Sequence, residues 1–275
     1  MSETPPPDSR VRAPASPAQS DGGRFGRGAQ PPSEHYSDGE MMSAVIAREV
    51  RDGETAAVGT LAPVPAAGVL LAHMSHAPRA RILIFNHPDY WPFRHGSKEF
   101  YDYAQRGNFD LFFLSGGQID RHGNLNLITI GDHDRPTLRF PGGAGSAMLY
   151  YMARRVILFR MEHEPRIFVE RVDTIASPGS SPPDVARPGG PWKCVTPLCV
   201  FRFDPARKEL VVESAHPGVS VEELQRRTGF PLGLAAPPPV TPAPTSEELA
   251  LLRGPVKAAL AKTYPRFAEA VFSSP

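Results

Sequence analysis

SGGQIDRHGNLNLIT, residues 115–129, is the most informative stretch of this chain. It follows the apolar run LFFL (111–114), whose length and aromatic content are typical of a buried strand. The strand ends in Gly116-Gly117, a pair that lets the backbone turn sharply and exposes its N–H groups to something that comes close. Gly123-Asn124 is a second turn signal, after which residues 125–130 resume a strand-like pattern. The stretch therefore predicts a buried strand, a glycine turn and a return strand.

Length and composition indicate a globular protein. The chain has 275 residues, and its 41% hydrophobic content is enough for one large α/β domain. Thirty basic and 29 acidic residues nearly cancel, so neither nucleic acid nor a membrane is an expected partner. No apolar run approaches the ~18 to 20 residues that span a bilayer. The N-terminus, MSETPPPDSR, lacks the basic start and apolar core of a secretory signal, so we expect a cytoplasmic protein.

The cysteines and histidines do not indicate a metal site. The chain has two cysteines, Cys194 and Cys199, which form neither a disulfide framework nor a zinc pattern and are expected as small core residues. His133 lies between two aspartates, but three adjacent residues on an extended segment point in alternating directions and cannot all reach one ion. We interpret that segment as a solvated turn, and we predict no metal.

The order of segments predicts one folded domain behind a tail. Residues 1–36 are rich in proline, glycine and serine with few large aliphatic side chains, which is typical of disorder. Residues 37–275 form the predicted domain, with a surface loop at 177–191 and a proline-rich linker at 235–244. A helix at 41–50, a strand at 57–61, a helix at 63–73 and a strand at 81–85 give a βαβ opening, so the sheet is expected to be parallel there.

The remainder of the domain alternates in the same way. We expect helices at 98–106, 147–153, 221–227 and 247–262, strands at 156–159 and 167–169, and a hairpin of 195–203 with 209–214.

Four ordered motifs resemble a known family. SGGQIDRHGNLN, the loop FPGGAGSA (140–147), VERVDTIASPG (169–179) and SAHPGVSVEELQRRTGF (214–230) are similar to the B (beta) subunit of class I CoA-transferases. The similarity covers roughly residues 40–265 and is greatest to the glutaconate CoA-transferase type and its steroid ring-cleaving relatives. It implies an α/β CoA-transferase-like open sheet, partly parallel and flanked by helices. It also implies a heteromer with an alpha (A) subunit, and acyl-CoA as the substrate, so that coenzyme A is the bound group.

The glycine loops are the candidate coenzyme A site that this resemblance implies. In the family, acyl-CoA thioesters bind across a subunit interface lined by these loops. A thioester carbonyl that gains negative charge needs fixed N–H donors about 3 Å away, and glycine turns supply them without side-chain obstruction. The candidates are Gly116, Gly117, Gln118, Gly142, Gly143 and Gly145. The alternative is that these glycines only permit tight turns and close packing.

Three further motif residues have structural alternatives. Asp120 is expected to bind backbone N–H groups of the turn that follows it. Arg121 is expected to face solvent or to pair with a phosphate of coenzyme A. His216, followed by Pro-Gly, is expected to end a strand and begin the next helix.

One position departs from the family pattern. The resembled transferases attack the thioester with a glutamate that follows the strand RILIF (81–85), but here Asn86 and His87 stand there. An amide is a poor nucleophile and cannot form an acyl anhydride. Three alternatives remain open: an A subunit donates the nucleophile; the complex performs hydrolytic ring cleavage or decarboxylation, with Asn86 as a polariser and His87 as acid or base; or the chain is a non-catalytic CoA-binding scaffold. In the last case both residues only shape a turn.

Overall fold

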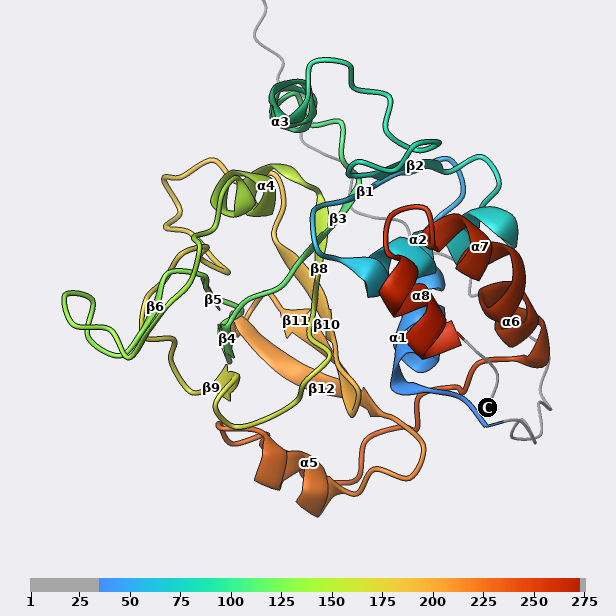
Figure 1. Cartoon of the computed structure of the whole chain (residues 1–275). Helices are drawn as coiled ribbons and strands as arrows, with labels where there is room; N and C mark the ends of the chain where they lie inside the picture. The colour runs from blue at the N-terminus through green and yellow to red at the C-terminus, as the bar shows by residue number, and fades with distance from the viewer. Residues whose placement is uncertain (1–34, 273–275) are drawn as a thin grey trace, which may run out of the picture. The chain divides into compact units, whose positions relative to one another are not determined.

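A seven-stranded mixed sheet forms the centre of the domain. The computed structural model describes residues 35–272, and the strand order is β12-β11-β10-β8-β3-β1-β2. The five strands from β10 to β2 run parallel, whereas β11 and β12 pair antiparallel at one edge. Helices cover both faces (Figure 1). The predicted open, partly parallel α/β sheet is confirmed.

At the start of the domain, the helix at 63–74 and the strand at 81–84 agree with the predicted bounds to within one residue, whereas the helix predicted at 41–50 lies at 38–47 and the strand predicted at 57–61 lies at 55–58. The helices are α1 (Asp38–Ala47), α2 (Pro63–Met74), α3 (Ser97–Gln105), α4 (Ser146–Met152), α5 (Val221–Arg227), α6 (Ser246–Leu251), α7 (Lys257–Leu260) and α8 (Pro265–Phe272). The main-sheet strands are β1 (Thr55–Val58), β2 (Arg81–Ile84), β3 (Leu111–Leu114), β8 (Arg155–Phe159), β10 (Pro191–Val195), β11 (Cys199–Asp204) and β12 (Glu209–Ala215). Two small sheets contain β4 (Gln118–Asp120), β5 (Leu125–Asn126) and β9 (Phe168–Val169), and β6 (Thr129–Ile130) with β7 (Leu138–Arg139).

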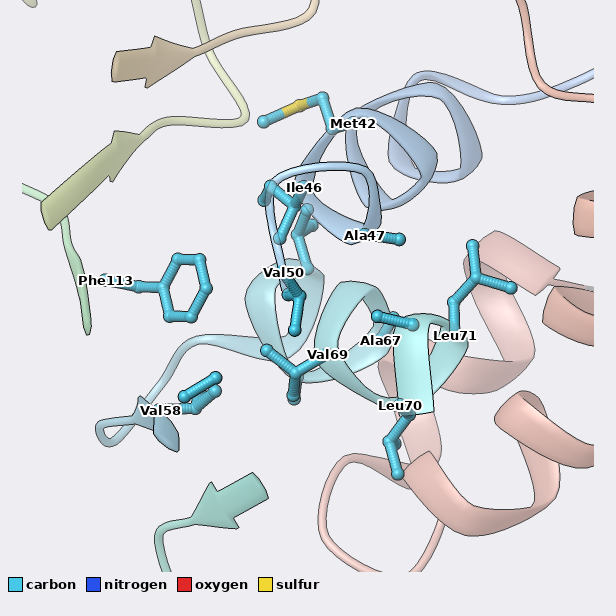
Figure 2. Close-up of a cluster of buried hydrophobic side chains, with 14 of the residues drawn as sticks. Met42, Ile46, Ala47, Val50, Val58, Ala67, Val69, Leu70, Leu71 and Phe113 are labelled. Atoms are coloured by element: carbon cyan, nitrogen blue, oxygen red, sulfur yellow. The ribbon is translucent and has the colours of Figure 1, made fainter. Parts of the chain in front are cut away.

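Alternate residues of each parallel strand enter two different cores. Val58 and Phe113 face the first core with α1 and α2, whereas Ala57 and Phe112 face the second core with α3 and α4. Both faces of the strands are therefore buried, which explains their almost uninterrupted apolar sequences. Figure 2 shows the first core, where Ile46 of α1 and Val69 of α2 lie on the side of their helices that faces Phe113 of β3.

The contact between α1 and α2 depends on one glycine. A Cβ at Gly68 would lie 2.5 and 2.8 Å from side-chain carbons of Ile46. The two helices approach too closely for any side chain there, which is why a glycine stands inside a buried helix in spite of its conformational cost.

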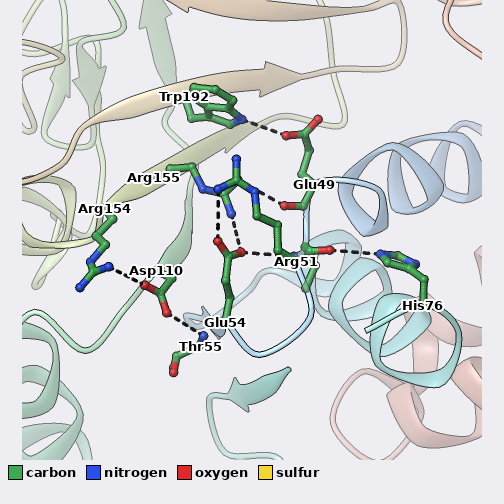
Figure 3. A network of polar contacts seen from close by, with 10 residues as sticks. Glu49, Arg51, Glu54, Thr55, His76, Asp110, Arg154, Arg155 and Trp192 are labelled. Atoms are coloured by element: carbon green, nitrogen blue, oxygen red, sulfur yellow. Dashed lines mark hydrogen bonds and ion pairs between the residues drawn. The ribbon is translucent and has the colours of Figure 1, made fainter. Parts of the chain in front are cut away.

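The amino ends of the parallel strands carry a network of compensated charges (Figure 3). Glu54 accepts a hydrogen bond from Arg155 at 2.5 Å, and Asp110 accepts one from the backbone N–H of Thr55 at 2.9 Å. Burial lowers the pKa of Arg155, and the attraction of Glu54 opposes that effect. The network joins the first residues of β1 and β8 through side chains as well as through the sheet.

Several predicted elements are corrected. Of the predicted tail, residues 1–34 lie outside the described residues, and Tyr36 packs against the first core instead of belonging to a tail. Residues 195–203 are not one strand, because β10 ends at Val195 and Thr196 begins a turn into β11. The predicted terminal helix contains a π-helical segment, Leu252–Val256, around Pro255, which has no N–H to continue an α-helix. Helix α8 was not predicted.

Loop 177–191 is a surface loop only in its middle. Residues 182–186 are exposed, but Ser177 and Gly179 are buried, and Ser177 bridges to Leu125. Both ends of the loop are therefore packed on the domain.

Candidate functional site

A cavity of about 790 Å³ lies at the carboxyl ends of the parallel strands. It is bounded by the residues that follow β1, β3 and β8, namely 59–62, 115–117 and Arg160. The chain passes from β1 to β2 on one side and then to β3 on the other side, so β1 and β3 mark a switch point of the sheet. Ligands of open α/β sheets bind outside the carboxyl ends of strands at such a point. The cavity is therefore the candidate active site.

Both predicted glycine loops line this cavity. Gly116 and Gly117 border it from one side, and Gly142, Gly143 and Gly145 border it from another. Gly142 has φ +101°, a conformation that favours glycine. The structure thus brings together two loops that are 25 residues apart in sequence, as the expectation of one shared site requires.

Gly117 of the Gly116-Gly117 pair has a packing role. The N–H of Gly117 donates to the carbonyl oxygen of Asn126 at 2.9 Å, so it is not a free donor for a thioester. A Cβ at Gly117 would lie 2.5 and 2.7 Å from two ring carbons of Phe140 and closer to a third. Gly117 therefore makes room for the Phe140 ring, which corrects the prediction that its N–H serves the substrate.

Gln118 does not reach the cavity. Its side chain is buried, accepts a hydrogen bond from Asn126 Nδ2 at 2.7 Å and donates to Asp173 at 3.2 Å. Its carbonyl and amide groups are thus used by Asn126 of β5 and by Asp173, which follows β9, and this favours a structural role. Gln118 as a coenzyme A ligand stays a prediction.

Asp120 holds the turn of the same hairpin. Its Oδ1 accepts from the N–H groups of His122 and Asn124 at 3.0 and 2.9 Å, and its Oδ2 accepts from Asn124 Nδ2 at 2.9 Å. The predicted turn-anchoring role of Asp120 agrees with this geometry. Gln118, Asp120 and Asn124 of the motif therefore build the hairpin, whereas Gly116 and Gly117 face the cavity.

Arg121 is engaged by two carboxylates of the chain itself. It forms ion pairs with Glu170 at 2.9 Å and Glu209 at 3.1 Å, and these carboxylates raise its pKa. Arg121 is therefore only partly exposed, and a contact with a phosphate of coenzyme A stays a prediction. Its side chain joins the motif turn to the start of β12.

Asn86 and His87 follow β2 but lie outside the residues that line the cavity, whereas their neighbour Phe85 lines it. Asn86 is exposed and has φ +59°, which asparagine tolerates. His87 is fully buried, with Nε2 3.0 Å from the Ala259 carbonyl and Nδ1 accepting from the Asp89 N–H. Both ring nitrogens of His87 are engaged, which favours the turn-shaping alternative for it. A catalytic role for either residue stays a prediction.

The charged residues of the cavity are two arginines. Arg160 and Arg166 line it and share Glu162, at 3.6 Å and 2.6 Å respectively. Within residues 35–272, no carboxylate, histidine, cysteine or lysine lines the cavity. Sequence reasoning missed both arginines. The position of Arg160, directly after a buried parallel strand, was the available signal, since that edge of the sheet is where ligands bind.

Leu61 was also missed. It lines the cavity, is 87% exposed and has φ +54°. Such a conformation costs a leucine on the order of 1 to 2 kcal/mol. Nothing in the sequence signalled a strained, exposed leucine at this edge.

Two further buried histidines, His163 and His216, lie in a polar cluster outside the residues that line the cavity. His163 and His216 both contact Thr196, through its hydroxyl at 2.9 Å and its carbonyl at 2.8 Å. Burial lowers the pKa of His163 to about 3 and that of His216 to about 4. His216 thus has the structural role expected of it. Both cysteines are buried and unpaired, as predicted.

Comparisons with known proteins agree with this geometry. A family model for coenzyme A transferase matches residues 89–226, about half of the chain. The chain belongs to the coenzyme A transferase family. It is 31% identical over 244 residues to the B subunit of 3-oxoadipate CoA-transferase from Pseudomonas knackmussii, covering 79% of this chain and 92% of the relative. It is 28% identical over 231 residues to the B subunit of glutaconate CoA-transferase from Acidaminococcus fermentans, covering 73% and 85%.

A third relative has a different activity in its name. The IpdB subunit of a cholesterol ring-cleaving hydrolase from Rhodococcus jostii is 30% identical over 151 residues, 51% of this chain and 56% of the relative. The similarity to B subunits of CoA-transferases confirms that this chain is a beta-type subunit of the family. The relatives favour neither transferase nor hydrolase chemistry for this chain.

Solved structures confirm the fold. The glutaconate coenzyme A-transferase of Acidaminococcus fermentans superposes with a TM-score of 0.73 at 24% identity, covering 87% of this chain and 98% of that chain. The decarboxylase AibA/AibB gives 0.68 at 22% identity, covering 86% and 99%. Within residues 35–272, no helix is long and apolar enough to cross a membrane, and no group of three His, Cys, Asp or Glu side chains is placed to hold a metal ion.

Proposed function

We propose that this chain is the beta subunit of a two-subunit enzyme that acts on acyl-CoA thioesters. The reaction takes place in the cavity at the carboxyl ends of β1, β3 and β8, and an alpha subunit supplies the reacting carboxylate. One observation carries this proposal: the cavity is lined by both glycine loops and by two arginines, but by no carboxylate within residues 35–272. The lining can therefore contact a substrate, but it offers no carboxylate that could act as the nucleophile.

The chemistry of a thioester explains why such a site needs a partner. Attack on the carbonyl places negative charge on its oxygen, which fixed N–H donors stabilise. Attack also requires a nucleophile, and acyl transfer through an enzyme-bound anhydride requires a carboxylate. Glycine turns at the cavity fit the first requirement. Its hydroxyl groups, such as that of Ser115, have no adjacent histidine or carboxylate in the lining to activate them.

The two arginines indicate the class of acyl group. Arg160 and Arg166 share a single carboxylate, Glu162, so this part of the wall is electropositive. The remaining lining is largely apolar, with Phe112, Phe140 and Leu149 among its members. An acyl chain with an apolar middle and a distal carboxylate, from a dicarboxylic or ring-derived acid, matches this distribution.

A binding comparison tests this specificity. Arg160→Gln should raise KM for an acyl-CoA with a distal carboxylate about ten-fold, since a charge-assisted contact is worth roughly 1.5 to 3 kcal/mol. It should leave KM for the matching monocarboxylic acyl-CoA within two-fold. An equal rise for both substrates would show that Arg160 supports the wall and does not read the carboxylate.

Co-expression with an alpha-type subunit tests the function as a whole. We expect the two chains to co-purify and to turn over acyl-CoA only together. Turnover by this chain alone, or a failure of this chain to associate with any alpha subunit, would refute the proposal. Asn86→Glu extends the test: gained transferase activity would place the exposed end of β2 beside the thioester in the assembly. Asn86→Gln is the matched control, because it lengthens the side chain without adding a carboxylate.

The missing glutamate favours a second candidate, a CoA-dependent ring-cleaving hydrolase or decarboxylase subunit. Product analysis separates the two, because a transferase forms a new thioester only when an acceptor acid is present, whereas a hydrolase or decarboxylase needs no acceptor. A complex that binds coenzyme A but turns over no thioester would instead indicate a scaffold subunit.

A further inference from the structure

A second hollow lies away from the cavity, at the amino ends of β8 and β10. It measures about 410 Å³ and is formed by loop 177–191, the residues that begin the two strands, and the turn between β11 and β12. We call it the amino-end groove. Arg154, Arg155 and Trp192 form its wall at β8 and β10. Figure 3 shows these residues near Glu54 and Asp110, at the amino ends of the strands. The cavity of the proposed function is at the opposite ends of these strands.

The amino-end groove is cationic. Four cations line it, Arg154, Arg155, Arg187 and Lys208, and its lining contains no carboxylate within residues 35–272. Arg155 is largely compensated by Glu54 at 2.5 Å, and Arg154, which is mostly exposed, lies 3.4 Å from Asp110. Neither Arg187 nor Lys208 has a carboxylate within ion-pair distance in the part of the chain that the structure describes. The groove therefore carries positive charge that the described domain does not balance.

Arg187 shows that this charge is built into the wall. Its guanidinium donates to the carbonyl oxygens of Pro178, Gly189 and Tyr150 at 2.7, 2.9 and 3.2 Å. It also stacks over the rings of Tyr150 and Tyr151, 4.9 and 4.6 Å from their centroids. Carbonyl and ring contacts orient the cation but do not neutralise it, and an incompletely solvated cation without an anion is energetically costly.

The loop that carries Arg187 is held in place at both ends. A Cβ at Gly179 would lie 2.8 and 2.9 Å from backbone atoms of Gly123, and one at Gly189 would lie 2.5 Å from the carbonyl carbon of Ala153. With the three carbonyl contacts of Arg187, these close approaches fix the wall before any ligand binds. Preorganisation of this kind favours binding, because little conformational entropy is lost on association.

An aromatic surface completes the amino-end groove. Trp192 is 39% exposed, so part of its indole ring is accessible to a ligand. Its ring is oriented by a hydrogen bond from Nε1 to Glu49 at 2.9 Å and by the Arg155 guanidinium, 5.8 Å from the ring centroid. A fixed, accessible indole beside exposed cations suits a ligand with a flat ring and negative charges, since nucleobases stack on aromatic side chains.

We propose that the amino-end groove binds a nucleoside phosphate, with Arg154 and Lys208 contacting the phosphates and Trp192 stacking on the base. A volume of about 410 Å³ lies within the range of small-molecule sites. The same chemistry belongs to a free nucleotide and to the adenosine phosphate portion of coenzyme A. The inference does not depend on the proposed thioester activity, because it concerns binding at a different place.

Isothermal titration calorimetry of the full chain with ADP tests the proposal. Lys208 has φ +55°, so Lys208→Gly removes the charge without opposing the backbone. We expect Arg154→Gln combined with Lys208→Gly to weaken ADP binding at least ten-fold. Arg207→Gln is the matched control: it removes an exposed cation from the same turn, outside the groove, and should change the affinity less than two-fold.

A second pair of titrations separates the base from the phosphates and one source from the other. Trp192→Leu should weaken ADP binding several-fold but leave pyrophosphate binding unchanged. If the double variant also weakens coenzyme A but not pantetheine, the ligand is the nucleotide end of coenzyme A; if coenzyme A is unaffected, it is a free nucleotide. No ADP binding at 1 to 5 mM (on the order of the weakest useful affinities), or equal binding by the double variant and Arg207→Gln, would overturn the proposal.

Discussion

Replacing Gly117 by alanine should force the Phe140 ring out of its place beside the cavity. The new Cβ would lie 2.5 and 2.7 Å from two carbons of that ring, whereas ordinary carbon contacts are 3.4–4 Å. The ring therefore has to move by about 1 Å or more. Since Phe140 is only partly buried and lines the cavity, the ring can move, and the space it enters is cavity space.

The magnitude follows from how freely each neighbour can move. Overpacking of this kind typically costs about 1 to 3 kcal/mol, and the mobility of the Phe140 ring places Gly117→Ala at the lower end. At Gly116 the new Cβ would lie 2.7 Å from the Gln118 carbonyl oxygen and 3.3 Å from that of Asn126, which are backbone atoms of the hairpin. Gly116→Ala should therefore cost more, about 3 kcal/mol, because the backbone of a paired hairpin cannot move aside.

Urea unfolding and a double-mutant cycle measure this difference. Phe140→Leu should recover most of the stability lost in Gly117→Ala and none of that lost in Gly116→Ala. Gly254→Ala is the control, since a Cβ there meets nothing within 4 Å. Equal losses for Gly116→Ala and Gly117→Ala, with no recovery by Phe140→Leu, would refute the assignment of Gly117 to ring accommodation.

Three further outcomes follow from the structure. Leu61→Gly should leave the free energy of unfolding unchanged or raise it by up to about 1 kcal/mol, because glycine adopts the left-handed backbone conformation without strain. The same variant should raise the KM for acyl-CoA in the assembled enzyme, since Leu61 lines the cavity. A clearly less stable variant would contradict this reasoning. Below pH 6.5, the ordinary histidine pKa, His163 and His216 are protonated in the unfolded chain but stay neutral in the folded chain, because burial lowers their pKa values. The free energy of unfolding, measured by urea titration, should therefore fall from pH 6.5 toward pH 4, and it should fall less steeply in His163→Gln. Cys194 and Cys199 should resist thiol reagents at pH 8 until the chain unfolds, because burial raises the pKa of both thiols; rapid labelling of the native chain would contradict that burial.

The parallel half of the fold was predictable because its signals are local. The run LFFL and the sequence RILIF are buried on both faces, and such strands are recognisable from composition alone. The Ser220 cap, whose hydroxyl accepts from the Glu223 N–H, marks the start of α5 at the predicted residue. The turn at Thr196 was missed because its hydrogen bonds come from a side chain inside an apolar run, where hydrophobicity carries no boundary signal.

The candidate site was predictable where it depends on glycine. Turns that need glycine are visible in a sequence, and the resemblance to the CoA-transferase family assigned both loops to one site. The roles of Gln118 and Arg121 were not predictable, because their partners Asp173 and Glu209 lie 55 and 88 residues away. A polar side chain in a motif looks the same in sequence whether it faces a ligand or a distant carboxylate, and only tertiary contacts decide between the two.

The charge distribution of the sheet ends supports a half-site more strongly than the missing glutamate alone. At the amino ends of the strands, Glu54 and Asp110 each form an ion pair with an arginine, so the carboxylates there are neutralised by neighbouring cations. At the carboxyl ends, Arg160 and Arg166 share Glu162, and the cavity wall contains no carboxylate within residues 35–272. A carboxylate that enters such a cavity from another subunit has its pKa lowered by the two cations and stays ionised, which is the form that attacks a thioester.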